Sequence, residues 1–109
     1  MEIDYIEFIV RDIEETKGFF GSAFAWNFTD YGPEYASFDD GRLTGGFAKG
    51  EPVPGGPLVI LRSDDLEAAR AAVVSAGGTI VKEIFAFPGG RRFHFADPSG
   101  NVLAVWSEK

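Results

Sequence analysis

The segment IEFIVRDIEETKGFFGSAF, residues 6–24, decides the fold because a second segment, VILRSDDLEAARAAVVSAG at residues 59–77, repeats its pattern. When Asp12 is placed on Asp65, apolar, acidic and basic positions coincide along the two segments. Each segment begins as a strand of β-branched and aromatic residues and continues as a helix whose apolar positions recur every three or four residues. This self-similarity indicates a chain built from two copies of one structural unit.

Each copy continues with three short strands separated by turn residues. The stretch KGEPVPGGP, residues 49–57, is rich in Pro and Gly and is typical of a linker. We therefore predict an α+β protein with one domain over residues 1–109, formed by module one (about 1–50), a linker (about 51–56) and module two (about 57–109). The predicted strands after the helices are about 26–30, 34–38 and 43–48 in module one, and 79–84, 91–96 and 102–106 in module two.

Composition excludes several classes of partner. Lys and Arg number 10 and Asp and Glu 17, so the formal charge of −7 argues against a nucleic-acid partner, which requires clustered cations. Without cysteine there is no disulfide framework or thiolate metal site. No apolar run approaches the roughly 20 residues that span a bilayer, and the acidic start does not resemble a secretory signal. These features predict a soluble, cytoplasmic protein with no membrane partner.

Alternation along the first strand separates two faces. Ile6, Phe8 and Val10 form an apolar row that is suited to packing against the helix. The opposite row carries Tyr5 and Glu7, a carboxylate among apolar neighbours. This second face is a candidate ligand surface, with Tyr5 as a stacking wall.

The same alternation applies to module two. Leu58 and Ile60 lie on the face away from the predicted helix, and so do Arg92 and His94, because Phe93 and Phe95 form the core row. Trp106 is a second candidate stacking wall, although it could equally fill the core or a dimer interface.

The chain resembles a known superfamily over almost its whole length. The resemblance lies in DYIEFIVRDIEETKGFFGSAFAWNF, in GGF, and in FHFADPSGNVLAVW, where the Asp-Pro-x-Gly-Asn turn after an aromatic strand is the most specific piece. These features resemble the vicinal oxygen chelate superfamily of glyoxalases, bleomycin-resistance proteins, fosfomycin-resistance enzymes and extradiol dioxygenases, and most closely its small glyoxalase-like proteins. The resemblance implies two βαβββ modules whose strands form a curled mixed sheet around a ligand cup, commonly in a homodimer.

Metal-dependent members of this superfamily have ligands at four places in the pattern. Here those places hold Tyr5, Leu58, Ala104 and Gly45, the last with a register uncertainty of about one residue. A divalent metal needs imidazole or carboxylate donors, which these side chains do not supply. The resemblance therefore implies a metal-independent protein without a cofactor, as in the bleomycin-resistance branch, although a metal recruited by other ligands remains an alternative.

Two polar residues are candidates for chemistry. His94, three residues before the Asp-Pro turn, occupies a place that contacts ligand in the fosfomycin-resistance branch, and an ordinary imidazole pKa near 6.5 suits acid–base work. Glu7 is a candidate general base or an anchor for a cationic ligand. The structural alternatives are an aromatic-type strand position for His94 and an ion pair of Glu7 with Arg62 or Arg92.

Three functional hypotheses follow. The leading hypothesis is a protein that binds a small aromatic or cationic molecule in the cup. The second is a lyase or isomerase in which Glu7 and His94 transfer protons, and the third is a dimeric interaction module whose cup is filled by its own side chains. The residues expected to line the cup are Tyr5, Glu7, Leu58, Ile60, Arg92, His94 and Trp106.

Overall fold

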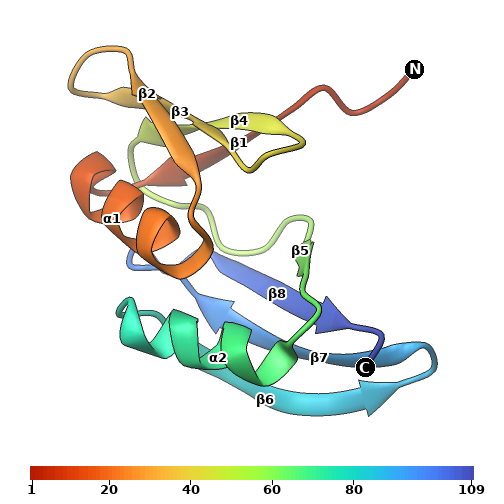
Figure 1. Ribbon diagram of the computed structural model, residues 1–109. Coiled ribbons are helices and arrows are strands. Elements are labelled where there is room, and N and C mark those ends of the chain that lie inside the picture. Colours follow the sequence, from red (N-terminus) through yellow and green to blue (C-terminus); the bar gives the residue numbers. More distant parts are fainter.

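Two βαβββ modules follow one another along the chain, as predicted (Figure 1). The computed structural model describes all residues from 1 to 109. The α+β fold class is confirmed, and the strand predictions are correct to within about two residues except that β6 extends further. Module one contains β1 (Tyr5–Val10), α1 (Ile13–Phe24), β2 (Asn27–Asp30), β3 (Tyr35–Asp39) and β4 (Thr44–Lys49). Module two contains β5 (Val59–Arg62), α2 (Leu66–Ser75), β6 (Thr79–Phe87), β7 (Gly90–Ala96) and β8 (Val102–Ser107).

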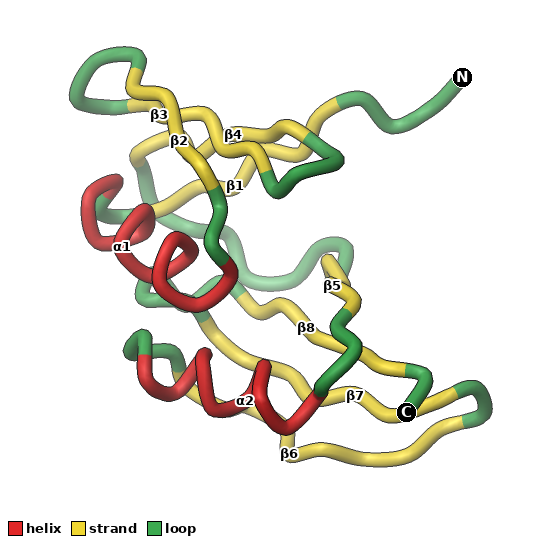
Figure 2. Tube along the Cα trace, viewed as in Figure 1, coloured by secondary structure: helices red, strands yellow, loops and turns green.

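The two modules form separate sheets with the same topology (Figure 2). Sheet one has the order β1-β4-β3-β2, and sheet two has the order β5-β8-β7-β6. In each sheet the first strand runs parallel to the last strand of its module, and the other pairs are antiparallel. No ladder joins the two sheets within one chain, so β1 and β5 each keep a free edge.

Both helices begin in the same way, which explains why the repeat is visible in the sequence. The carboxylate of Asp12 accepts a hydrogen bond from the backbone N–H of Glu15 at 2.9 Å, and that of Asp65 accepts one from Ala68 at 3.0 Å. An aspartate at this position satisfies an N–H group that has no partner within the helix. The aligned aspartates therefore set the start of α1 and α2.

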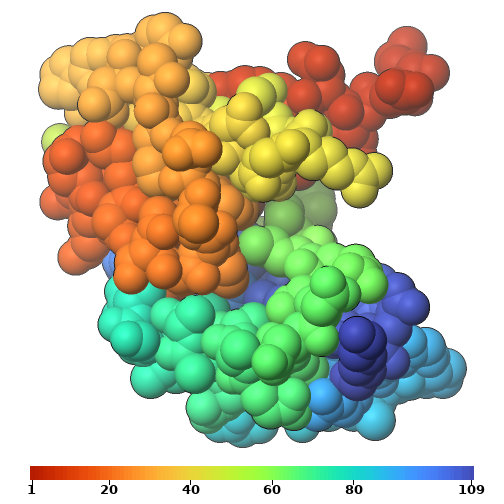
Figure 3. Space-filling model, in the orientation of Figure 1, coloured from red at the N-terminus to blue at the C-terminus, as the bar shows by residue number.

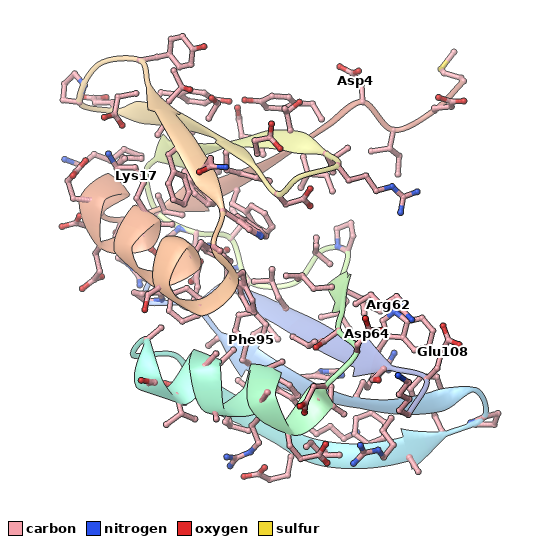
Figure 4. All side chains as sticks on the ribbon, viewed as in Figure 1. Asp4, Lys17, Arg62, Asp64, Phe95 and Glu108 are labelled. Carbon is pink, nitrogen blue, oxygen red and sulfur yellow. The ribbon has the colours of Figure 1, made fainter.

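The core lies between the two sheets. Phe20 of α1 stacks on Phe47 of sheet one at 5.3 Å between ring centroids. Phe19 and Phe24 contact Phe95 of sheet two at 5.9 and 5.7 Å between ring centroids; Phe95 is labelled in Figure 4. Helices α1 and α2 also contact each other. The helix-side faces of the two sheets therefore face each other across the helices, and their opposite faces, here called the open faces, point outward.

The Asp-Pro-Ser-Gly-Asn turn before β8 connects the modules. Gly100 has a φ of 91°, as expected for this turn. Beyond the turn itself, the backbone N–H of Arg11 donates to the Ser99 hydroxyl at 2.8 Å and its guanidinium donates to the Ser99 carbonyl at 2.7 Å. The Asn101 amide donates to the Ile9 carbonyl at 2.9 Å. The segment interpreted as a turn is thus also a polar link from module two to the end of β1.

Neither helix has the length and apolar character needed to cross a lipid bilayer.

Candidate functional site

Tyr5, Glu7, Arg92 and His94 of the predicted cup lie on the open faces, as strand alternation predicted. Tyr5 and Glu7 are on the open face of sheet one, because Ile6 and Phe8 face the core cleft and Val10 is fully buried. The remaining five residues of the predicted cup belong to module two. Arg92, His94, Ile60 and Trp106 share the open face of sheet two by register, although Ile60 and Trp106 also border the cleft between the modules, and Leu58 directly precedes β5.

A hydrogen-bonded cluster of Tyr5, Glu7 and Tyr35 occupies the open face of sheet one. The Tyr35 hydroxyl donates to Glu7 Oε1 at 2.9 Å and lies 2.6 Å from the Tyr5 hydroxyl. Since Tyr35 has one hydroxyl proton, Tyr5 is the donor of the second bond. Burial, with the hydrogen bonds to Tyr5 and Glu7, raises the pKa of Tyr35 well above its usual value. Tyr35 therefore presents a neutral phenol at pH 7.

Glu7 does not form the ion pair that was considered for it. Arg62 is held instead by Asp64 at 3.0 Å and Glu108 at 3.2 Å, at the end of sheet two (Figure 4). Arg92 makes no salt bridge. The partner of Glu7 is a tyrosine from its own sheet, so the carboxylate stays available on the open face.

A glycine lies beneath the two tyrosines. Gly46 is paired with Glu7 in the β1–β4 register, and a Cβ at this position would collide with the Tyr35 and Tyr5 hydroxyl ends. A Cβ at Gly45 would instead meet the Ile6 carbonyl and the Phe38 ring on the helix side. The open-face position of the GGF motif is therefore Gly46, one residue beyond the expected Gly45 and within the stated register uncertainty.

The open face of sheet two carries cations above aromatic rings. Lys82 Nζ lies 4.3 Å from the centroid of the Phe85 ring, and the Arg92 guanidinium lies 5.3 Å from Phe85 and 5.5 Å from Phe87. The His94 ring is 5.9 Å from Phe85. Phe87 also approaches the Trp106 ring at 6.4 Å. We call this set the cationic–aromatic cluster: Lys82, Phe85, Phe87, Arg92, His94 and Trp106.

Polar atoms inside this cluster lack partners. Arg92 Nε and His94 Nε2 are both buried and make no hydrogen bond. Burial, together with the charges of Arg92 and Lys82, lowers the pKa of His94, so its imidazole is neutral at pH 7. Buried polar groups in folded proteins are normally hydrogen-bonded, so unpaired atoms on a candidate ligand surface are informative.

The neighbours of these cations on the other side of the sheet are all paired. Arg91 forms a two-pronged ion pair with Glu67 of α2 at 2.6 and 3.1 Å, and Glu83 pairs with Arg70 of α2 at 2.7 Å. Arg91 and Arg92, adjacent on β7, therefore point to opposite faces of the sheet. Among the Lys and Arg residues of α2 and of strands β5 to β8, only the open-face cations Lys82 and Arg92 have no acidic partner. Elsewhere in the chain, Arg42, Lys49 and Lys109 also have none.

Sequence reasoning missed four residues of the two clusters. Tyr35 could have been found, because it alternates with the buried Ala36 and Phe38 on a predicted strand. Phe85 and Phe87 lie beyond the predicted end of their strand. Simple alternation would place Lys82 on the opposite face of the strand from these two rings. A register shift in β6 between Lys82 and Phe85 adds one residue, which brings both to the open face.

The two clusters are not joined within one chain. No hydrogen bond, ion pair or ring contact connects Tyr5, Glu7 or Tyr35 to the cationic–aromatic cluster. A cleft of about 900 Å³ instead lies between the modules on their helix sides, visible as a hollow in Figure 3. Of its 20 lining residues 15 are hydrophobic, but only Ile60 and Trp106 belong to the predicted cup.

The side chains at the family's metal positions do not form a donor set. Ala104 is fully buried between Ile60 and His94 in the sheet register, and the Tyr5 hydroxyl is bound to Tyr35. Leu58 has no lone pair, and any side chain at Gly46 would displace the tyrosines. No group of three or more His, Cys, Asp or Glu residues is arranged to hold a metal ion. These residues do not fit a divalent metal.

Comparisons with known proteins agree with this architecture. The family model described as Glyoxalase/Bleomycin resistance protein/Dioxygenase superfamily matches residues 2–105. An uncharacterized protein of Mycolicibacterium smegmatis is 28% identical over 109 residues, covering 97% of this chain and 93% of its own length.

Solved structures share the fold at low sequence identity. A glyoxalase/bleomycin resistance protein/dioxygenase family enzyme from Burkholderia phytofirmans superposes with a TM-score of 0.86 at 19% identity, covering 100% of both chains. A fosfomycin resistance protein from Listeria monocytogenes, in complex with Mn(II) and dihydroxypropylphosphonic acid, superposes with a TM-score of 0.84 at 16% identity, covering 96% of this chain and 88% of its own.

Proposed function

Because the chain belongs to the glyoxalase/bleomycin resistance protein/dioxygenase superfamily, we propose that it binds a small aromatic molecule over its open faces without a metal ion. The observation that carries this proposal is the cationic–aromatic cluster, in which Phe85, Phe87 and Trp106 form a wall beside unpaired nitrogen atoms of Arg92 and His94. Ligand sites combine aromatic surface with a few placed polar groups. A wall of this composition suits a planar organic molecule.

Metal independence rests on the four family positions. Tyr5, Leu58, Gly46 and Ala104 supply no imidazole or carboxylate, so Lewis-acid activation of a substrate has no evident support among them. Binding without turnover is the simplest activity that these residues support.

A second copy of the chain completes the cup in this proposal. The open faces point outward on opposite sides of one chain, so Tyr5 and Glu7 of one copy need the Arg92 and His94 face of another. Both first strands have free edges with exposed apolar side chains, Ile9 at 38% and Ile60 at 43% exposure. Pairing β1 of one copy with β5 of its partner would bury these edges and bring the two clusters into one cup.

An enzymatic role is the second candidate. The neutral imidazole of His94 can accept a proton at pH 7, and the Glu7 carboxylate lies free of any cation. Because the two lie on different sheets, a lyase or isomerase using both would also need the second copy.

The proposal is tested by a thermal-shift screen of aromatic compounds on the purified full chain, followed by calorimetry of any hit. Binding that is weakened by Trp106→Ala supports it. In parallel, elemental analysis after exposure to Zn, Ni, Mn and Fe salts should return no stoichiometric metal. A stoichiometric metal would overturn the metal-independent part of the proposal, and a screen without binders would overturn the binding part.

A further inference from the structure

We infer that the ligand of the open face carries an anionic group, most simply a carboxylate, which binds at Arg92 beside His94 and Lys82. This inference rests on the proposed function and adds the charge of the ligand to it. It differs from the cationic ligand that the net acidity of the chain favours, because local side chains rather than the net charge face a bound molecule.

The first support is the contrast between the two faces of sheet two. On the helix side, Arg91 and Arg70 are both matched by glutamates at 2.6 to 3.1 Å. On the open face, Lys82 and Arg92 have no acid, although acids outnumber bases by 17 to 10 in the chain. In a chain with an excess of carboxylates, two adjacent unmatched cations on one face mark a place that an external anion can fill.

The second support is desolvation. Arg92 is half-buried against Phe85 and Phe87, and its Nε atom has no hydrogen-bond partner. A charged group taken out of water without a partner costs free energy, which an anion at the outer guanidinium nitrogens would offset. The planar guanidinium fork matches the two oxygens of a carboxylate.

The third support is the position of the rings relative to the cations. Phe87 and Trp106 come from β6 and β8, the two strands that flank Arg92 of β7, and their rings approach each other at 6.4 Å, while Phe85 lies beneath both Arg92 and Lys82. A ligand whose ring stacks on Phe87 and Trp106 can therefore place its carboxylate between Arg92 and Lys82. Arg62, at the edge of the same face, is neutralised by Asp64 and Glu108 and does not compete for it.

The experiment compares three probes with the same ring: 2-naphthoate, 2-naphthamide and 2-naphthylmethylammonium. They are titrated by calorimetry into the full chain at pH 7.5 and low salt. We expect the carboxylate to bind about tenfold tighter than the amide or more, in line with hydrogen bonds to a charged group, and the ammonium to bind weakest. The carboxylate should also shift the imidazole resonance of His94, which is the only histidine.

Variants assign the preference to the open face. Arg92→Gln should remove the preference for the carboxylate, and the exposed Lys82→Gln should reduce it even if Arg92→Gln proves unstable. Arg70→Gln removes the same charge from α2, on the other side of the sheet, and should leave the preference intact.

The outcomes separate this inference from the proposed function. If the three probes bind equally, or the ammonium binds best, the anion assignment is overturned while binding of an aromatic molecule stands. A preference that survives both Arg92→Gln and Lys82→Gln also overturns it. If none of the probes binds, the proposed aromatic site falls together with this inference.

Discussion

Adjacent residues on a strand point to opposite faces of the sheet, so side chains added at Gly45 and at Gly46 would meet different neighbours. At Gly45 a methyl group would press on the Ile6 carbonyl, whose strand pairs with β4, and on the buried Phe38 ring. At Gly46 the obstacles are the hydroxyl ends of the half-buried Tyr35 and the 41% exposed Tyr5, which are side-chain ends that can swing away. The neighbours of Gly45 are backbone and a buried ring that cannot move aside, whereas the neighbours of Gly46 are tyrosine side-chain ends that can.

We therefore expect Gly45→Ala to lower the free energy of unfolding by about 3 kcal/mol or more, because overpacking against backbone forces the sheet apart. Gly46→Ala should cost only about 1 kcal/mol, the net worth of the displaced tyrosine hydrogen bond. Urea denaturation of the two variants measures the difference. Equal losses would contradict the assignment of Gly46 to the open face.

The titration of His94 should make the free energy of unfolding depend on pH. Its pKa is lowered in the folded protein from the usual 6.5, first by burial and then by the charges of Arg92 and Lys82. Between the folded pKa and 6.5 the unfolded chain binds more protons, so stability falls as pH decreases through this window. His94→Gln should reduce the pH dependence of the unfolding free energy within this window.

The direct readout of this pKa is the single imidazole resonance in an NMR titration. It should titrate below 6.5 in the folded protein, and Arg92→Gln should move it upward without restoring the ordinary value, because burial is the larger cause. A folded-state pKa at or above 6.5 would contradict the buried, cation-flanked position of His94.

Much of the candidate site was predictable at the residue scale. Alternation along β1 and β7 correctly placed Tyr5, Glu7, Arg92 and His94 away from the helices. The same rule failed for β6, since the register shift after Lys82 changes which side chains share a face. A bulge leaves no clear mark in the sequence, and so Phe85 and Phe87 were not identified.

The elements themselves follow from local signals. Asp12 and Asp65 fix the helix starts, and the repeat fixes the order of strands. What local signals do not contain is a contact between distant segments. The Asp-Pro-Ser-Gly-Asn turn was predictable as a turn, but its link to β1 depends on how the modules pack.

The amide of Asn101 makes that link measurable. It donates to the Ile9 carbonyl at 2.9 Å and to Asp97 at 3.2 Å, and Asp97 is buried. Asn101→Ala leaves both acceptors short of a donor, so we expect a loss of about 1 to 2 kcal/mol in thermal or urea unfolding. Asn27→Ala, on the exposed part of β2, is the control and should stay within about 0.5 kcal/mol. Equal losses of stability for the two variants would contradict a stabilising role for the hydrogen bond from Asn101 to Ile9.

At the scale of the whole molecule, the fold was predictable but the arrangement of its modules was not. The repeat specifies two sheets, each with a helix on one side. It does not specify whether the open faces meet within a chain, since that depends on the packing of α1 against sheet two through Phe19, Phe24 and Phe95. Because these aromatic contacts hold the helix-side faces of the two sheets toward each other, the open faces turn outward, and the proposed function therefore requires a second copy to complete the cup.

This requirement predicts a dimer that depends on the free strand edges. A lysine at Ile9, which is 38% exposed on β1, should leave the folded chain intact but place a charge in the proposed β1–β5 contact. We expect sedimentation at several concentrations to show wild-type dimer and Ile9→Lys monomer. Val74→Lys introduces the same change on α2 at a site that is 49% exposed, and should remain dimeric. A wild-type chain that stays monomeric at the highest concentration would contradict a cup formed by two copies. If Ile9→Lys and Val74→Lys dissociate alike, the dimer does not depend on the edge of β1.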